Sequence, residues 1–473
     1  QVTANAPADA KSEYSTLYEA EPVASPTPPS FTCDYYASPT GTANGSGSNT
    51  SPWNLYTALN KTTLVRNGKT LCLKGGTYAG KFISNLDGGG VVRSAPGEWA
   101  KIDGYLTTQL NGAINSSQTT LTVASSTNIV DGSVLSIDTE HVLVTSTVSG
   151  NTRMVIRGWN GTTPAAHSSG AVITHVGNQL TVNGDNMTYR DLEITNSLPQ
   201  RDLTPPGLDD QGCCGFYSKI RGAGVVVANR SGNSLINLIV HDNLDGIFTG
   251  SSSSNTLVYG CIAYNNCGHW KNPIEGERGA GNGMYLENTA GYSRVYETIS
   301  VNNFGHGGQF FGVTGPYVGG DTQGSVFANA GSPMRGIDPN TAYRNMLFGA
   351  DQQAAPTGSV TNSHFYHPAG MGYSVNFGYG AGIIAGIFTN NYVIGSNAGF
   401  EASSVTSLTM TVNKFYSAGS GDISVLSQRL PYVWNNNTYY GTGTNQFRFG
   451  DTTSHNNLNF TAWKTATGFD LLS

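Results

Sequence analysis

The chain has 473 residues, a formal net charge of −6 and only 11% charged residues, so it lacks the basic footprint of a nucleic-acid-binding protein. No apolar run reaches the roughly 18 residues that a membrane-spanning helix needs. The few Lys and Glu, together with 61 Gly and 24 Tyr, argue against long helices and favour an all-β protein with many turns.

Residues 1–30 are rich in Pro and Ala and contain few core-forming side chains. This composition is typical of an extended arm, which we expect to pack on the body of the protein or on a neighbouring subunit. Self-assembly through this arm is therefore a hypothesis. Gln1 is interpreted as the terminus left after removal of a signal peptide, which predicts a secreted protein.

Residues 31–105 are predicted to form the entry to the fold. A short helix is expected to start at Ser51-Pro52, because Trp53, Tyr56 and Leu59 follow at helical spacing. Such an element is needed at this end, since the first strands of a stack otherwise present unpaired edge groups.

Residues 106–176 contain alternating strands joined by hairpin turns, one of them at Ser149-Gly150-Asn151. The segment is predicted to be a small inserted β module. Its carboxylates Asp138 and Glu140 are interpreted as solvated residues of a strand face.

From Gly222 to Gly312 the chain repeats every roughly 22 to 25 residues, which indicates stacked strand-only repeats. Each repeat runs from a glycine corner to a closing asparagine. The corner glycines are Gly224, Gly246, Gly283 and Gly307, and the asparagines are Asn243, Asn266 and Asn303. We expect the asparagine amides to bond one another in a ladder, as Asn tolerates the backbone of such turns.

Alternation within the strands predicts which side chains face inward. The first strands place Val225 and Val227, Ile247 and Thr249, Met284 and Leu286 on the inner face. The second strands are predicted to stack Ile239, Ile262 and Ile299 in an inward column, with His241 in the inward register of Tyr264 and Val301.

This pattern resembles the right-handed parallel β-helix superfamily of pectate lyases, many polysaccharide hydrolases and phage tailspikes. The run from Thr298 to Gly307 resembles repeats of secreted bacterial members. The resemblance implies an all-β right-handed parallel β-helix with an N-terminal cap and a small inserted β module. Residues 31–105 would be the cap and first coils, and 177–473 the helix with corner loops and a C-terminal cap. No catalytic motif of the superfamily is found, so no catalytic residue is carried over.

Six cysteines in a chain rich in Ser, Thr and Asn indicate an oxidising compartment, although six cysteines allow 15 connectivities. Cys33 is expected to pair with Cys72, because both flank the start of the fold. Cys213 and Cys214 are expected to reach Cys261 and Cys267 of the neighbouring coil.

Two corner insertions, residues 198–221 and 268–280, leave successive coils and are expected to wall the outward face of the first strands. This face is predicted to bind sugar through Phe248, Tyr285, Gln309 and the loop residue Trp270. Candidate proton-transfer and charged groups are Glu287, His306, Asp245, Glu277, Lys271 and Arg278.

Two reactions on an extracellular polysaccharide fit these residues. A glycoside hydrolase needs two carboxylates, for which Glu287 with Glu277 or Asp245 are candidates. A polysaccharide lyase needs a cation and a base, here Lys271 or Arg278 with His306. In that case calcium is a possible cofactor, held by oxygens of Asp245, Asn282 and Glu287. The alternative is a non-catalytic extracellular structural, fibre or filament subunit.

Overall fold

We analysed a computed structural model of the chain. It describes residues 31–198, 221–266, 268–272, 276–288, 290–312, 319–331, 343–350, 355–367, 373–395, 398–417, 423–425, 432–441, 447–449 and 458–471. The chain divides between Thr32 and Cys33, and the account below concerns the unit that starts at Cys33. The predicted arm, residues 1–30, lies outside the described residues.

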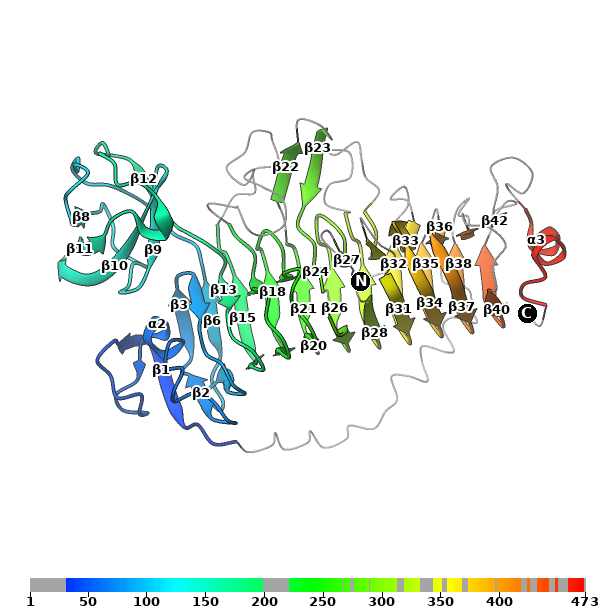
Figure 1. Cartoon of the computed structure of the whole chain (residues 1–473), viewed down its shortest axis with the longest axis horizontal. Coiled ribbons are helices and arrows are strands. Elements are labelled where there is room, and N and C mark those ends of the chain that lie inside the picture. Colours follow the sequence, from blue (N-terminus) through cyan, green and yellow to red (C-terminus); the bar gives the residue numbers. More distant parts are fainter. Residues whose placement is uncertain are drawn as a thin grey trace, which may run out of the picture. The chain divides into compact units, whose positions relative to one another are not determined.

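Three parallel sheets wind around one core, and each turn of the chain adds one strand to each sheet (Figure 1). The fold is therefore the expected right-handed parallel β-helix, with about one coil more than the roughly ten that the repeats predict. Sheet A contains β1 (Tyr35–Thr42), β2 (Thr70–Leu73), β5 (Val91–Ser94), β14 (Thr188–Arg190), β17 (Ser234–Ile236), β20 (Leu257–Tyr259), β25 (Ser293–Tyr296), β28 (Gly319–Gln323), β31 (Ala355–Thr361), β34 (Ile383–Thr389), β37 (Val405–Thr411) and β40 (Val433–Asn435).

The second and third sheets follow sheet A in every coil. Sheet B contains β3 (Gly76–Ala79), β6 (Ala100–Asp103), β15 (Leu192–Thr195), β18 (Ile239–His241), β21 (Ile262–Tyr264), β26 (Ile299–Val301), β29 (Val326–Ala328), β32 (His364–His367), β35 (Tyr392–Gly395), β38 (Lys414–Ser417) and β41 (Thr438–Gly441). Sheet C contains β4 (Phe82–Ser84), β13 (Leu180–Val182), β16 (Val225–Val227), β19 (Ile247–Thr249), β24 (Met284–Leu286), β27 (Gly308–Gly312), β30 (Met346–Ala350), β33 (Tyr373–Gly380), β36 (Ala398–Ala402), β39 (Ile423–Val425) and β42 (Phe447–Phe449).

The core is a set of inward columns along the helix. Val225 pairs in register with Ile247, which pairs with Met284, and all three are buried. Further along, stacked phenylalanines fill the interior, as in the pair Phe310 and Phe348 with ring centroids 4.6 Å apart. The residues of the first strands that the sequence predicts to face inward are in this core. Successive side chains of a strand point to opposite faces, so the residues between them face outward.

The asparagine ladder is also present at the corner between sheets B and C. Asn243 donates from its backbone N–H to Asn266 Oδ1, and Asn266 donates in the same way to Asn303 Oδ1. All three side chains are buried. The ladder supplies partners for corner backbone groups that have no strand neighbour, which a buried turn requires.

The second strands are reversed relative to the prediction. Ile299 is 40% exposed, whereas Ser300 between Ile299 and Val301 is fully buried. Ile239, Ile262 and Ile299 form the expected column, but it faces outward, as do His241 and Tyr264. In Ile239-Val240-His241 and Ile262-Ala263-Tyr264 no alternation favours either face, and in Ile299-Ser300-Val301 the alternation favours the wrong one. Ser300 is accommodated inside because its hydroxyl donates to the carbonyl of Gly307.

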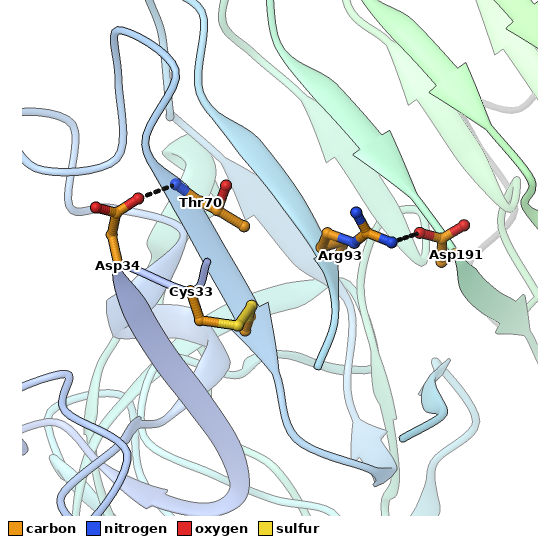
Figure 2. The surroundings of a disulfide bond; sticks show 6 residues. Cys33, Asp34, Thr70, Arg93 and Asp191 are labelled. Atoms are coloured by element: carbon orange, nitrogen blue, oxygen red, sulfur yellow. Dashed lines mark hydrogen bonds and ion pairs between the residues drawn. A yellow bond between two sulfur atoms is a disulfide. The ribbon is translucent and has the colours of Figure 1, made fainter. Parts of the chain in front are cut away.

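The N-terminal cap combines a short helix with a disulfide. Helix α2 (Leu55–Ala58) begins after Asn54, whose side chain accepts the backbone N–H of Thr57, so it starts later than predicted. The Cys33–Cys72 disulfide joins the entry of β1 to β2 and confirms the expected pairing (Figure 2). An ion pair between Arg93 and Asp191, 2.6 Å apart, links the next coils in the same view.

Cys261 is a free, fully buried thiol, so its predicted pairing is wrong. Its side chain points inward at the corner between sheets A and B, and its sulfur lies 3.4 Å from the backbone nitrogen of Leu238. Burial raises the pKa of this thiol to about 12. Cys213, Cys214 and Cys267 lie outside the described residues.

A separate antiparallel sheet of six strands occupies residues 107–175. Its strands, in spatial order, are β7 (Thr107–Gln109), β12 (Val172–His175), β9 (Val134–Ile137), β10 (Glu140–Ser149), β11 (Thr152–Ile156) and β8 (Thr120–Thr122). Ser149 pairs with Thr152 across the predicted hairpin turn. The sheet has its own apolar core, which includes Leu135, Val142 and Ile173.

The interpretation of Glu140 as a solvated residue is wrong, since it is fully buried. Arg157 holds both carboxylate oxygens at 2.7 Å, and His167 Nε2 lies 2.9 Å from Oε2. Asp138, on the other side of His167, is exposed as expected, with Oδ2 2.7 Å from Nδ1. A buried carboxylate is tolerated only where such partners compensate its lost hydration.

Two smaller elements complete the described fold. The corner insertion between sheets B and C of one coil contains the hairpin β22 (Gly268–Asn272) and β23 (Gly276–Ala280). Helix α3 (Phe460–Thr467) follows the last coil, where Trp463 and Phe469 are buried against Trp434.

Candidate functional site

The outer face of sheet C is the candidate site, and its central residues are buried rather than open. Val226, Phe248 and Tyr285 point outward in register on neighbouring strands. Together with Ala223, Phe311 and Leu347 they form a second apolar cluster outside the helix core. Phe248 and Tyr285 pack edge to face with centroids 5.4 Å apart. Because these strands are buried on both faces, their sequences are almost continuously apolar.

At the entry to sheet C, one polar residue per coil forms a column, made of Asp245, Asn282, His306 and Arg344. Asp245 Oδ1 accepts the backbone N–H of Asn282 at 2.8 Å, and Asn282 Oδ1 accepts that of His306 at 2.8 Å. His306 Nδ1 accepts the N–H of Arg344 at 2.9 Å. The first three side chains therefore satisfy the backbone of the next coil, which gives the column a structural role at this corner.

Asp245 is the buried carboxyl of this column. Its Oδ2 has no hydrogen-bond partner among the described residues. Burial raises the pKa of Asp245 to about 6, against the lowering effect of the Asn282 N–H. The carboxyl therefore keeps its proton to a higher pH than an ordinary aspartic acid, which is the direction of shift that a general acid needs.

His306 is less suited to the base role predicted for it. Its Nδ1 lone pair accepts the backbone N–H of Arg344, so in the neutral ring the proton lies on Nε2. Its ring also packs edge to face on Tyr343, with centroids 5.6 Å apart. The histidine therefore positions the backbone of Arg344 in this arrangement.

Glu287 lies at the opposite end of the strand from this column. It is 7% exposed and follows Leu286, which pairs with Phe310. It is five positions from Asn282, which is about 16 Å of strand at about 3.3 Å per residue. Paired glycosidase carboxylates lie about 5 to 9.5 Å apart. The structure therefore does not bring Glu287 to Asp245 or His306 as a catalytic pair.

The calcium set suggested by the sequence does not fit for the same reason. Asp245 and Asn282 use their Oδ1 atoms on backbone N–H groups, and Glu287 is at the far end of the strand. Among the described residues, no group of three His, Cys, Asp or Glu side chains is placed to hold a metal ion.

The candidate residues of the corner insertion are placed by backbone alone. In the hairpin, Lys271 pairs in register with Glu277, and Trp270 with Arg278. Their side chains, and Glu275, lie outside the described residues. The same holds for residues 199–220 of the other insertion.

A charged cluster lies further along sheet C, over β30, β33 and β36. Arg344 Nη2 is 3.2 Å from Glu401 Oε2, and the amide of Asn376 donates to the same oxygen. The Asn376 Oδ1 atom is buried and has no hydrogen-bond partner among the described residues. The guanidinium carbon of Arg344 lies 5.9 Å from the ring centroid of Tyr379, which is 48% exposed.

We call Arg344, Asn376, Tyr379 and Glu401 the sheet C cluster. Alternation along the strands gives no reason to join Asn376 and Glu401 to Arg344. Arg344, just before β30, and Glu401, in β36, are 57 positions apart, and β33 lies between those two strands. Their contact depends on the register across three coils, and the corner segments between them obscure that register in the sequence.

Comparisons with known proteins give only distant likenesses. The sequence matches no protein-family model and no curated protein. Among solved structures, the chain is similar to the pectate lyase Pel9A at 15% identity, covering 92% of this chain and 84% of that chain with a TM-score of 0.45.

Two further solved structures resemble the chain. A lacto-N-biosidase of the GH136 type from Eubacterium ramulus is 12% identical over 86% of this chain and 68% of its own, with a TM-score of 0.43. An alginate lyase from Paenibacillus sp. is 12% identical over 82% of this chain and 97% of its own, with a TM-score of 0.40. Likeness at this level carries no argument about chemistry, and the fold assignment rests on the strand pairing above.

The described helices were also considered as membrane spans. None of them is long and apolar enough to cross a bilayer.

Proposed function

We propose that the protein is secreted, binds an extracellular polysaccharide on the outer face of sheet C and cleaves it there by hydrolysis. The observation that carries the proposal is the sheet C cluster with its unpartnered acceptor, Asn376 Oδ1. A buried amide oxygen without a donor is costly, and a sugar hydroxyl is a donor of the right kind. Tyr379 beside it offers the exposed aromatic surface that suits the C–H face of a sugar ring.

Charge favours a neutral sugar over a uronate. From β19 to β36, the described outward side chains of sheet C include the carboxylates of Asp245, Glu287 and Glu401 and one guanidinium, that of Arg344. Arg344 is already paired with Glu401. Elimination from a uronate needs a cation to neutralise the sugar carboxylate, so hydrolysis of a neutral glycan fits this face better.

In the proposed reaction Glu401 is one of the two carboxylates that hydrolysis requires. Arg344 and Asn376 hold it in one orientation, and His306 positions the backbone of Arg344. The sequence candidates Glu277, Lys271 and Arg278 remain proposed contributors from the corner hairpin, with Trp270, Gln309, Tyr285 and Phe248 as proposed substrate contacts.

Secretion is supported by the Cys33–Cys72 disulfide, since such bonds persist in oxidising compartments. The N-terminal arm remains a proposed contact to the body or to another subunit.

The test is a screen of neutral and uronate polysaccharides that reads both new reducing ends and the absorbance of unsaturated products. Hydrolysis of a neutral glycan should give reducing ends without absorbance. Glu401→Gln should lower turnover by at least about a hundredfold, whereas Asp321→Asn on the outer face of sheet A should leave it unchanged. Turnover of Glu401→Gln at the wild-type rate would refute the role of this cluster.

A structural subunit is the second candidate, and one observation favours it. Ile299 and Val326 are neighbours in register on the outer face of sheet B and are 40% and 37% exposed. An exposed apolar strip suits lateral association. Ordered polymers in electron micrographs, with no cleavage in the screen, would favour this function instead.

A further inference from the structure

We propose that the outer face of sheet B carries a separate binding subsite for a neutral saccharide, built from Trp99, Glu193, His241 and Asp242. It goes beyond the proposed function, because it lies on another sheet and shares no residue with the sheet C cluster. The sequence does not predict this subsite, since His241 is predicted to face inward and no sequence pattern assigns a role to the other three residues.

The four side chains form a continuous polar chain across neighbouring coils. Trp99 Nε1 donates to Glu193 Oε2 at 2.9 Å, and Glu193 Oε1 lies 3.4 Å from His241 Nε2. His241 Nδ1 lies 2.7 Å from Asp242 Oδ2, and Asn265 donates to Asp242 Oδ1 at 3.2 Å. These contacts fix the rotamers before any ligand arrives, so binding loses less side-chain entropy.

Trp99 supplies the surface on which a sugar ring can pack. Its indole is 44% exposed, and its N–H is held by Glu193. Among the described residues, no other ring or cation is stacked on it. An oriented, exposed indole matches the C–H face of a neutral pyranose, which buries apolar surface against an aromatic ring.

Several other aromatics of sheet B have a ring face covered by a neighbour, and the exception among the described residues is Tyr366, which is 49% exposed. Tyr392 is covered by His364 at 4.8 Å on one side and lies 4.9 Å from Lys414 Nζ. Tyr416 and Tyr440 stack on each other with centroids 4.7 Å apart. Their rings stack along the helix axis, as cross-strand pairs do, and Trp99 is set apart from them.

The polar chain beside Trp99 selects a neutral ligand. Both nitrogens of His241 face a carboxylate oxygen, so the carboxylates of Glu193 and Asp242 flank the imidazole on either side. The remaining lone pairs of Glu193 accept hydrogen bonds from hydroxyl groups. Two carboxylates repel the carboxylate of a uronate and so favour a neutral glycan, although Lys101, in register with Glu193, offsets part of their charge.

This arrangement supports binding and not hydrolysis. The two ring nitrogens of His241 are about 2.2 Å apart, and each contacts one carboxylate oxygen. The contacting oxygens of Glu193 and Asp242 are therefore at most about 8 Å apart, which is within the range for inverting hydrolysis. The imidazole itself occupies the space between them, where a sugar and a water would have to lie.

Affinity electrophoresis tests the subsite directly, in gels that contain a galactomannan, a xyloglucan, polygalacturonate or alginate. We expect at least one neutral glycan to retard the wild-type protein. Trp99→Ala should weaken that retardation by about tenfold in Kd, and Trp99→Phe, which keeps an aromatic face, should lose less. Tyr440→Ala, which removes an exposed aromatic from the same sheet, is the matched control and should bind like wild type.

Three outcomes overturn the proposal: no retardation of the wild type by any neutral glycan, equal binding of Trp99→Ala and wild type, or loss of polyuronate binding in Trp99→Ala. Matching melting temperatures of the variants and the wild type establish that all are folded. The two proposals can be refuted independently. Glu401→Gln tests hydrolysis at the sheet C cluster through product release, and Trp99→Ala tests the sheet B subsite through retardation in the gel.

Discussion

At the corner between sheets A and B, one residue per coil adopts a left-handed backbone, and it is usually Asn or Gly. Positive φ angles occur there at Asp191, Asn237, Gly260, Glu297, Gly324, Asn362, Asn390 and Asn436. Val412 occupies the same position with a φ of 61°. A β-branched residue pays a steric penalty in this conformation, so Val412→Asn should raise the free energy of unfolding by about 1 kcal/mol.

Chemical denaturation measures this effect, and a second exposed valine provides the control. Val433 lies inside strand β40, where β-branched residues are favoured. Val433→Asn should therefore leave stability unchanged or lower it. Equal effects at both sites would show that exposure, and not backbone conformation, determines the outcome.

Asp245 gives stability a defined dependence on pH. Burial raises its pKa from 3.8 in the unfolded chain to about 6 in the folded protein, so the folded state holds the proton more tightly. The stabilisation is complete below pH 3.8 and is lost as the pH rises through 6. The full difference corresponds to roughly 3 kcal/mol.

Asp245→Asn should remove this dependence, because the amide oxygen can still accept the N–H of Asn282 and does not ionise. Unfolding curves of the two proteins should coincide near pH 4 and separate by pH 7, with the variant more stable. A constant difference across this range would contradict the assignment of the proton to Asp245.

A second ladder of hydrogen bonds from backbone N–H groups to side chains, at the corner between sheets A and B, explains why Cys261 is unpaired. The corresponding inward positions of later coils are Thr298, Ser325 and Ser363, and each side chain accepts a backbone N–H from the preceding coil. Cys261 is the sulfur member of this series. Its buried thiol should resist iodoacetamide in the native protein and react after denaturation.

Peptide mapping by mass spectrometry measures this labelling. Rapid modification of Cys261 in the native protein, or its recovery in a disulfide, would contradict the ladder assignment. Cys261→Ser should retain the acceptor and the fold, whereas Cys261→Ala should cost about 1 to 3 kcal/mol by leaving the Leu238 N–H unpaired.

In the six-stranded sheet, Glu140 is the residue on which local stability depends most. Although burial raises its pKa, hydrogen bonds from Arg157, Ala165, His167 and Gly158 together lower that pKa to about 2. Its contribution to stability is thus present above pH 4.5 and is lost as the pH falls toward 2.

Glu140→Gln should destabilise this sheet by about 3 to 5 kcal/mol, because Arg157 is left buried without a counter-charge. Hydrogen exchange at neutral pH should show faster exchange in β8 to β12 than in the wild type. Asp138→Asn, at the exposed end of the same network, should have a small effect. Unchanged protection of β10 and β11 in Glu140→Gln would contradict this account.

For the molecule as a whole, the repeat alone predicts the parallel β-helix, because the glycine corners and the asparagine ladder have a single structural explanation. Side-chain direction is predictable where a strand alternates, as at Val225 and Val227. It is not predictable in Ile299-Ser300-Val301, where the inward residue is the polar one and depends on a bond to Gly307.

The candidate site is predicted less completely, because its contacts join residues far apart in sequence. Periodicity identifies the column from Asp245 to Arg344 but not its use of backbone N–H groups. The periodicity also does not give the distance along the strand between Asp245 and Glu287. Trp99, Glu193 and His241 come together across three coils that the inserted module interrupts.

The most direct test of the central claim is a crystal structure of Glu401→Gln with an oligosaccharide of the glycan that the wild type cleaves. The account predicts a sugar on the outer face of sheet C, with a hydroxyl donating to Asn376 Oδ1 and a ring face against Tyr379. Sugar bound elsewhere, with Arg344, Asn376 and Tyr379 free of it, would contradict the claim.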